Sequence, residues 1–230
     1  MKQQDVTQNL PVAFADEVAD SSRRRFFQIG GGIVGAGMLL AACKKKNNDS
    51  GVNLGSGDMG ILNYAYALEQ LEAAFYTQVI ATQYAGITAD EVALLTDIRD
   101  HEVAHRQFFK AALGANAIQN LEVDFSTINF SSRASVLGTA KVFEDLGVSA
   151  YNGAGRLIVD PEYLLLAGKI VSVEARHAAY IRDLLADNSF ADLSAVDASG
   201  LDLKNTPSAV LAAAGPYIKT KINASNLPNM

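Results

Sequence analysis

The chain has 230 residues, which is enough for one domain with a sizeable core. Its formal net charge of -6 argues against a surface that binds nucleic acid, so no nucleic-acid partner is expected. The single cysteine excludes an intrachain disulfide.

The first 42 residues indicate an export signal that precedes the folded part of the chain. The twin-arginine pattern Ser-Arg-Arg-x-Phe-Leu-Lys is matched, except at its last two positions, by Ser22-Arg23-Arg24-Arg25-Phe26-Phe27-Gln28. Arg23 and Arg24 would be its paired arginines, and the apolar run that follows is too short to span a bilayer comfortably as a permanent helix. An ordinary secretory signal with a basic start is the alternative interpretation.

Cys43 ends the segment Leu40-Ala41-Ala42-Cys43, which resembles a lipobox. In this interpretation the signal is cleaved before Cys43, and acyl chains on this residue anchor the protein to a bacterial membrane, on the periplasmic or cell-surface side. A chance cysteine is the alternative. Residues 43–57 are rich in Lys, Asn, Gly and Ser, so they are predicted to form a flexible tether between the membrane and the domain.

Residues 58–186 have the spacing of apolar residues that is typical of four long helices. The first helix is expected from about residue 59 to 84, with Asp58 as its N-cap. The second is expected over 88–113, because Thr88-Ala89-Asp90-Glu91 forms a capping box and a glycine follows the helix.

A long connection over 115–131 separates the first helix pair from the second. Such a length fits the single crossover of a bundle in which the second and third helices run parallel. The third helix is expected over 132–159 and the fourth over 160–186. Asp160-Pro161 supplies an N-cap and a proline at the first helical position, which favours a helix start there.

The last part of the chain, 187–230, is predicted to be an extension that packs on the bundle. A short helix is expected over 207–214, and Gly215-Pro216 would end it. Tyr217 and Ile218 are expected to pack against the bundle.

Two Glu-x-x-His motifs, Glu102/His105 and Glu174/His177, lie in apolar stripes of the second and fourth predicted helices. Residues three apart share a helix face, so each motif directs a carboxylate and an imidazole toward one spot. A carboxylate that faces a core is costly unless something compensates it, and beside a histidine the usual compensation is a divalent metal. The alternative is an ion pair without metal, formed by Glu102 and Arg99.

The other two helices carry a second matching pair of residues. Glu69 and Glu144 are each followed seven positions later by a tyrosine, Tyr76 or Tyr151, which is expected to stack on the face of its own glutamate. Together with the two motifs, this order indicates an internal duplication of a helix pair. The tyrosines are expected to hydrogen-bond bridging carboxylates, to supply an electron or to be further metal ligands, and ordinary core tyrosines are the alternative.

Two residues beside these motifs have other expected places. Glu72 is better centred than Glu69 in the apolar stripe, but the repeat favours Glu69 as the ligand, because Gly147 stands at the position equivalent to Glu72. Glu72 is then a further metal ligand, a residue that supports the ligands, or the partner of Arg99 or Arg176. His101 is expected to point away from the first motif and to lie at the surface.

One Glu from each of two helices and a Glu-x-x-His from each of the other two make up the ligand set of carboxylate-bridged dimetal bundles. From about residue 59 to 185 the chain resembles the ferritin-like superfamily, in particular exported bacterial ferritin-like domain proteins, which show stretches like Leu68-Glu69-Gln70-Leu71-Glu72-Ala73-Ala74-Phe75-Tyr76. The resemblance implies an all-α fold, a four-helix bundle with one long crossover. Two iron or manganese ions suit the donor set. The predicted metal ligands are Glu69, Glu102, His105, Glu144, Glu174 and His177.

The pattern favours an exported, membrane-anchored protein whose dimetal site acts as an oxidase or removes peroxide. No cysteine cluster like that of rubredoxin is present in the sequence, so electrons would have to come from an unknown donor. Two alternatives stay open: a metal-binding or iron-handling lipoprotein without turnover, and a structural envelope protein with a vestigial site. The membrane anchor disfavours a storage cage, whereas a smaller homo-oligomer is compatible with the sequence.

Overall fold

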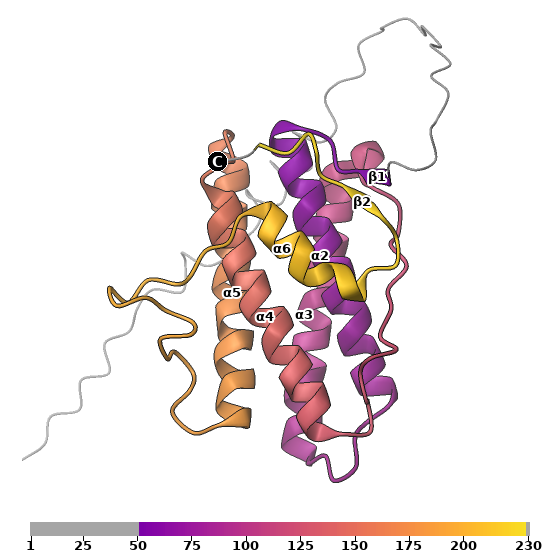
Figure 1. The fold of residues 1–230 in the computed structure, drawn as a ribbon, viewed down its shortest axis with the longest axis vertical. Helices are drawn as coiled ribbons and strands as arrows, with labels where there is room; N and C mark the ends of the chain where they lie inside the picture. The colour runs from indigo at the N-terminus through magenta and orange to yellow at the C-terminus, as the bar shows by residue number, and fades with distance from the viewer. Residues whose placement is uncertain (1–50, 229–230) are drawn as a thin grey trace, which may run out of the picture. The chain divides into compact units, whose positions relative to one another are not determined.

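The computed structural model describes residues 51–228, and within them the chain forms a four-helix bundle (Figure 1). The bundle consists of α2 (Gly57–Ala81), α3 (Ala89–Leu113), α4 (Arg133–Gly155) and α5 (Pro161–Leu185). α2 packs mainly against α3, and α4 packs mainly against α5. The all-α bundle expected from the sequence is confirmed.

The connection between α3 and α4 runs along the outside of the bundle (Figure 1). It begins with the 3-10 helix η2 (Gly114–Asn116) and returns the chain to the end of the bundle at which α2 stops. The rings of Phe125 and Phe130 pack on Phe75 of α2, with centroid distances of 5.9 and 6.0 Å. The connection is therefore the expected crossover, and α3 and α4 run parallel.

Two helix starts follow the local signals in the sequence. The Thr88 hydroxyl accepts a hydrogen bond from the backbone N–H of Glu91, and the Glu91 carboxylate accepts one from the backbone N–H of Thr88. This is the expected capping box at the start of α3. At the start of α5, the Asp160 side chain accepts a hydrogen bond from the backbone N–H of Glu162, and Pro161 follows it at the first helical position.

The start of α2 differs from the expectation. Its N-cap residue is Ser56, and Asp58 lies in the first turn. The Asp58 carboxylate accepts hydrogen bonds from the backbone N–H groups of Val159, at 2.9 Å, and Asp160, at 2.8 Å. The prediction of Asp58 as an N-cap is therefore wrong, because its side chain ties the start of α2 to the connection between α4 and α5 instead.

The C-terminal extension crosses the bundle and packs on it. The helix α6 (Pro207–Ala214) has the predicted bounds and packs against α4. The ring of Tyr217 meets Phe143 of α4 edge-on, with a centroid distance of 4.8 Å. The backbone carbonyl oxygen of Asn205 would lie 1.7 Å from a Cβ at Gly153, so this close approach requires glycine.

A small parallel sheet joins the two ends of the described chain. Its strands are β1 (Val52–Asn53) and β2 (Ile222–Asn223), and β2 follows the 3-10 helix η3 (Gly215–Tyr217). Leu54, directly after β1, is fully buried. Residues 51–57, which the sequence places in the tether, are thus part of the fold.

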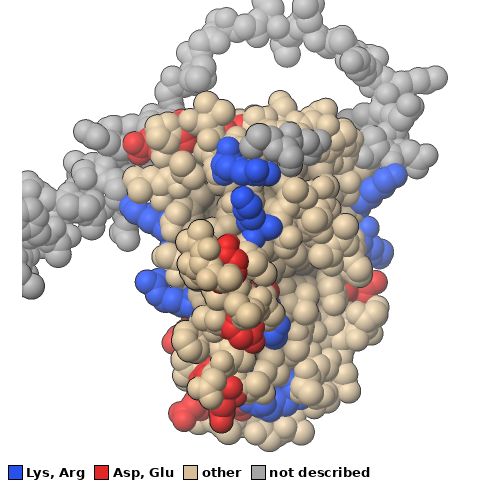
Figure 2. Space-filling view, turned by 60° about the vertical axis from the view of Figure 1, so that its left-hand side comes forward, with Lys and Arg blue, Asp and Glu red and all other residues tan. Residues whose placement is uncertain are grey.

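The residues expected to direct export and anchoring, Arg23, Arg24 and Cys43, lie outside the described residues. From residue 51 to 228, the chain has no helix that is long and apolar enough to cross a membrane. Figure 2 shows one face of the molecule, on which basic and acidic side chains are interspersed over the described part.

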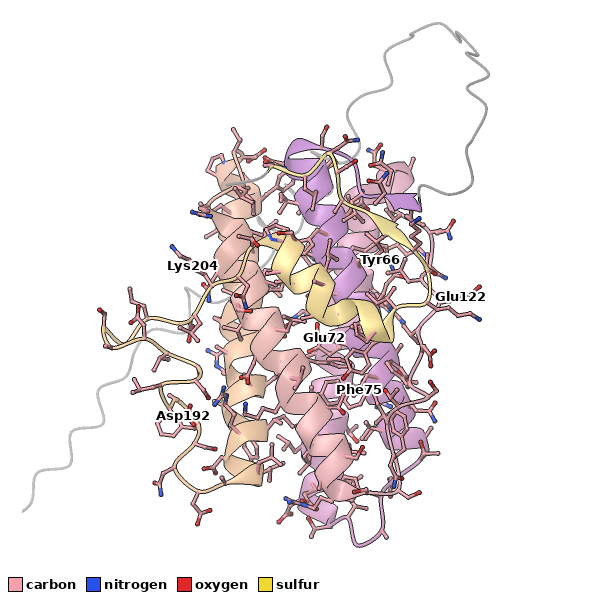
Figure 3. The ribbon with its side chains drawn as sticks, viewed as in Figure 1. Tyr66, Glu72, Phe75, Glu122, Asp192 and Lys204 are labelled. Carbon is pink, nitrogen blue, oxygen red and sulfur yellow. The ribbon has the colours of Figure 1, made fainter. Side chains whose placement is uncertain are left out.

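Arg182 of α5 links the bundle to the segment that follows it. Its side chain is 1% exposed, and Nε and Nη2 donate to the Asp145 carboxylate of α4 at 2.6 and 2.8 Å. Nη1 reaches the carboxylate of Asp192 at 3.2 Å, in the extension (Figure 3). The guanidinium therefore joins α4, α5 and the extension in one network.

Replacing Asp145 by alanine should lower the free energy of unfolding by about 3 kcal/mol, because it removes the main partner of a buried cation. Lys141→Ala is the matched control. It removes the other cation beside Asp145, at 3.0 Å, but this pair is more exposed and should be worth less than about 0.5 kcal/mol. Chemical denaturation measures both, and equally small losses would contradict the role of Arg182.

Candidate metal centre

The six predicted ligands converge in the middle of the bundle. Their four carboxylates have an exposed fraction of 0%, and the two histidine rings lie 6.4 Å apart between centroids. They are Glu69 of α2, Glu102 and His105 of α3, Glu144 of α4, and Glu174 and His177 of α5. Every helix of the bundle therefore contributes at least one side chain to the cluster.

The two imidazoles have mirrored surroundings. Nδ1 of His105 lies 2.9 Å from the glutamate of the other motif and 3.4 Å from Glu69. Nδ1 of His177 lies 2.9 Å from the glutamate of the other motif and 3.4 Å from Glu144. The two halves of the bundle thus face each other as copies, which agrees with the duplication inferred from the sequence.

The cluster divides into two groups of four side chains, each of which could hold one metal ion. Within a group, each residue offers one donor atom, and these atoms lie within 4.8 Å of one another. Glu102 and Glu174 belong to both groups. One group adds Glu69 and His105, and the other adds the equivalent residues of the second half. Two ions would therefore share two carboxylates, as in dimetal bundles.

Eight buried atoms of the cluster have no hydrogen-bond partner among the described residues. They are both carboxylate oxygens of Glu102 and Glu174, Oε2 of Glu69 and Glu144, and Nδ1 of His105 and His177. Contacts as short as 2.9 Å occur between them, but these contacts do not have the direction of hydrogen bonds. Because buried polar atoms are almost always hydrogen-bonded, this set of oxygen and imidazole donors fits metal coordination.

Two tyrosines hold the remaining oxygens of the unshared glutamates. The Tyr76 hydroxyl donates to Oε1 of Glu144, and the Tyr151 hydroxyl donates to Oε1 of Glu69. Burial raises the pKa of both tyrosines well above the usual value, so both keep the proton that they donate. Each tyrosine therefore hydrogen-bonds to the unshared glutamate of the other half. The expectations of a contact with a bridging carboxylate, or with the glutamate of the same helix, are wrong.

Glu72 lies inside the bundle beside the cluster (Figure 3). A Cβ at Gly147 would lie 3.1 Å from Oε1 of Glu72 and 3.4 Å from Oε2 of Glu174, so glycine leaves room for both carboxyl groups. Burial, and then the charge of Glu174, raises the pKa of Glu72 well above its usual value. Glu72 belongs to neither group of four, and as a neutral acid it is a neighbour of the donor set.

Of two residues beside the first motif, one does not form the ion pair that was the alternative to metal binding, and the other differs from its expected direction. Nε of Arg99 pairs with Asp100 at 2.7 Å, so the structure gives no support to an ion pair between Arg99 and Glu102. His101 is exposed, as expected, but it does not point away, because its Nδ1 lies 2.9 Å from Nε2 of His177. No local signal in the sequence predicts this contact, which depends on how α3 and α5 lie in the bundle.

The sequence model of the ferritin-like domain matches residues 57–187. The chain belongs to this family. The matched range runs from the start of α2 to just beyond the end of α5, so it contains the whole cluster. A comparison with curated proteins found no match.

In the ferritin-like domain, the charge state of the cluster follows from its burial and from the short distances between its carboxylates and imidazoles. Burial alone would lower the pKa of the two histidines, but the carboxylates beside them raise it, to about 12 for His105 and about 10 for His177. Burial raises the pKa of Glu69 to about 7 and that of Glu174 well above its usual value. Without metal, both imidazoles are therefore protonated at neutral pH, and part of the carboxylates are neutral.

Metal binding to Nδ1 of both histidines must displace these protons. Loading the metal-free domain with manganese at pH 8 should release about three protons per pair of ions, one from each imidazole and one from the neutral Glu174 carboxyl. The affinity should therefore rise with pH, and less steeply once His177 loses its proton near pH 10. Titration calorimetry in buffers of different ionisation enthalpy counts the released protons. An affinity that does not change with pH would contradict this assignment of donor atoms.

Proposed function

We propose that the protein is an exported, membrane-anchored ferritin-like protein whose dimetal centre, of iron or manganese, reacts with oxygen or peroxide. The observation that carries the proposal is the set of eight buried donor atoms without a hydrogen-bond partner among the described residues, arranged as two groups that share two glutamates. Four carboxylates and two imidazoles suit iron or manganese, whereas zinc favours fewer and softer ligands.

The burial of the cluster supports a small substrate. The four ligand carboxylates have an exposed fraction of 0%, and the side chain of His177 is 5% exposed. A reactant must therefore be small enough to enter the core of a packed bundle, which suits oxygen or hydrogen peroxide. When bound, the two ions supply the redox chemistry, and the protein supplies their position and a site from which water is largely excluded.

Each half of the cluster has the same division of roles. Glu102 and Glu174 would bridge the ions, because both oxygens of each lack another partner. Glu69 and Glu144 would each bind one ion through Oε2, because a tyrosine hydroxyl donates to the Oε1 of each. In the metal-free protein, burial raises the pKa of the Glu72 carboxyl well above its usual value, and this neutral carboxyl would lie beside the centre as a proton donor to a reduced oxygen product.

The proposed export route suits such a centre. The twin-arginine pathway carries folded proteins, so a protein with Arg23 and Arg24 in this signal would acquire its metals before export. The metal supply of the cytoplasm would then decide which ion is bound, in place of whichever ion binds best outside the cell.

The proposed anchor depends on Cys43 alone, because one residue would carry all acyl chains. Cys43→Ala should therefore move the protein from the membrane fraction to the soluble fraction, which immunoblots of fractionated cells measure. A second substitution nearby, Lys44→Ala, is the control and should leave the protein with the membranes. Membrane association of Cys43→Ala equal to that of wild type would overturn the lipoprotein proposal.

Metal analysis of the purified protein tests the function, with Glu174→Gln as the matched variant. Wild type should contain two iron or manganese ions per chain, and its absorption spectrum should change on exposure to oxygen or peroxide. Glu174→Gln should lose two-metal loading but keep its metal-free stability, because the amide resembles the neutral carboxyl group that burial favours here. When the free metal concentration is 100 times the dissociation constant, the free energy of unfolding should rise by about 2.7 kcal/mol for wild type and stay unchanged for Glu174→Gln.

The other outcomes of the same experiment identify the alternative functions. Two bound ions that stay inert to oxygen and peroxide would indicate a metal-binding or iron-handling lipoprotein without turnover. A protein that contains no metal, and takes up none when iron or manganese is supplied, would indicate a structural domain with a vestigial site.

A further inference from the structure

His101 and His177 form a hydrogen-bonded pair where α3 lies beside α5. Nδ1 of His101 lies 2.9 Å from Nε2 of His177. The ring planes are within 10° of parallel, and their centroids are 5.2 Å apart. The side chain of His177 is buried, whereas His101 is exposed. The pair therefore connects an imidazole of the candidate metal centre with the surface of the protein.

The surroundings of His177 decide the direction of this hydrogen bond. Its Nδ1 faces the carboxylates of Glu102 and Glu144 and has no hydrogen-bond partner among the described residues. An ion bound there uses the lone pair of Nδ1, so the proton of the neutral ring must be on Nε2. Nε2–H then donates to Nδ1 of His101, which acts as the acceptor.

We propose that His101 is a positioning residue for the metal site that contains His177. The inference rests on the proposed metal-binding role of His177. By accepting the hydrogen bond from Nε2–H, His101 fixes the tautomer of His177 and the angle of its ring, so that Nδ1 stays directed at the ion. Loss of such an outer hydrogen bond typically weakens metal binding by about 10- to 100-fold.

The duplicated half of the bundle lacks this acceptor at the equivalent position. Val173 precedes Glu174 as His101 precedes Glu102, and an aliphatic side chain cannot accept a hydrogen bond. The site that contains His105 therefore receives no such support from residue 173. The two sites are alike in their direct ligands but differ in what holds the histidine, so a change at residue 101 should affect one site alone.

Two substitutions of similar size separate the hydrogen bond from simple packing. His101→Asn keeps an acceptor, Oδ1, on the same side-chain carbon as Nδ1 of the histidine, whereas His101→Leu has the same branching without an acceptor. Zinc, which is diamagnetic, serves as the probe in a titration of metal-free protein followed by ¹⁵N-histidine NMR. The chain has three histidines, so His105 and His177 can be followed separately.

For His101→Leu, the His177 signals should need at least about tenfold more free zinc to reach half occupancy than in wild type, while the His105 signals titrate as before. His101→Asn should restore the wild-type behaviour of His177 to within about threefold. Equal titration of wild type and His101→Leu, equal weakening of both sites, or an Asn variant as weak as the Leu variant would each overturn the role of His101.

The same titration distinguishes this inference from the function on which it rests. If wild type binds no zinc at either histidine and metal analysis finds no uptake of iron or manganese, the metal centre itself is wrong and the role of His101 is wrong with it. If wild type binds zinc at both histidines but His101→Leu does not differ from it, the metal centre stands and the positioning role alone is overturned. Reactivity with oxygen does not enter either result.

Discussion

The burial of five glutamate side chains in the core of one helical bundle is the constraint on which the rest of the structure depends. Like charges in a low-dielectric interior are costly unless they are paired, hydrogen-bonded, protonated or bound to a cation. Two tyrosine hydroxyls donate to these carboxylates, whereas eight other buried atoms of the cluster, including Nδ1 of both histidines, have no hydrogen-bond partner among the described residues. Protons can satisfy this excess in the metal-free protein, whereas two divalent ions would satisfy it with every proposed ligand in place.

The scaffold holds these groups through contacts made far from the cluster. Asp58 ties the start of α2 to the start of α5, and Arg182 joins α4, α5 and the extension. The extension passes so close to Gly153 that its path is fixed against α4. Such contacts limit the movement of the four helices relative to one another, which would keep the donor atoms in position for a metal ion.

Features that neighbouring residues determine could be predicted from the sequence, whereas contacts between distant segments could not. The capping box at Thr88, the proline-assisted start at Asp160 and the bounds of α6 follow from neighbouring residues, and the structure has them. The Glu-x-x-His spacing likewise fixes a helix face. Three other features depend on how distant segments of the chain meet: the partner of Tyr76, the contact of His101 with the second motif and the pairing of β1 with β2. A single sequence contains no local signal for such contacts.

Anomalous diffraction from crystals of the full-length protein loaded with manganese is the most direct test of the central claim. Two peaks about 3.5–4 Å apart are expected inside the bundle, one beside Nδ1 of His105 and one beside Nδ1 of His177, with Glu102 and Glu174 between them. Crystals that show no manganese in the cluster, with the glutamates and histidines hydrogen-bonded to one another or to water, would contradict the account.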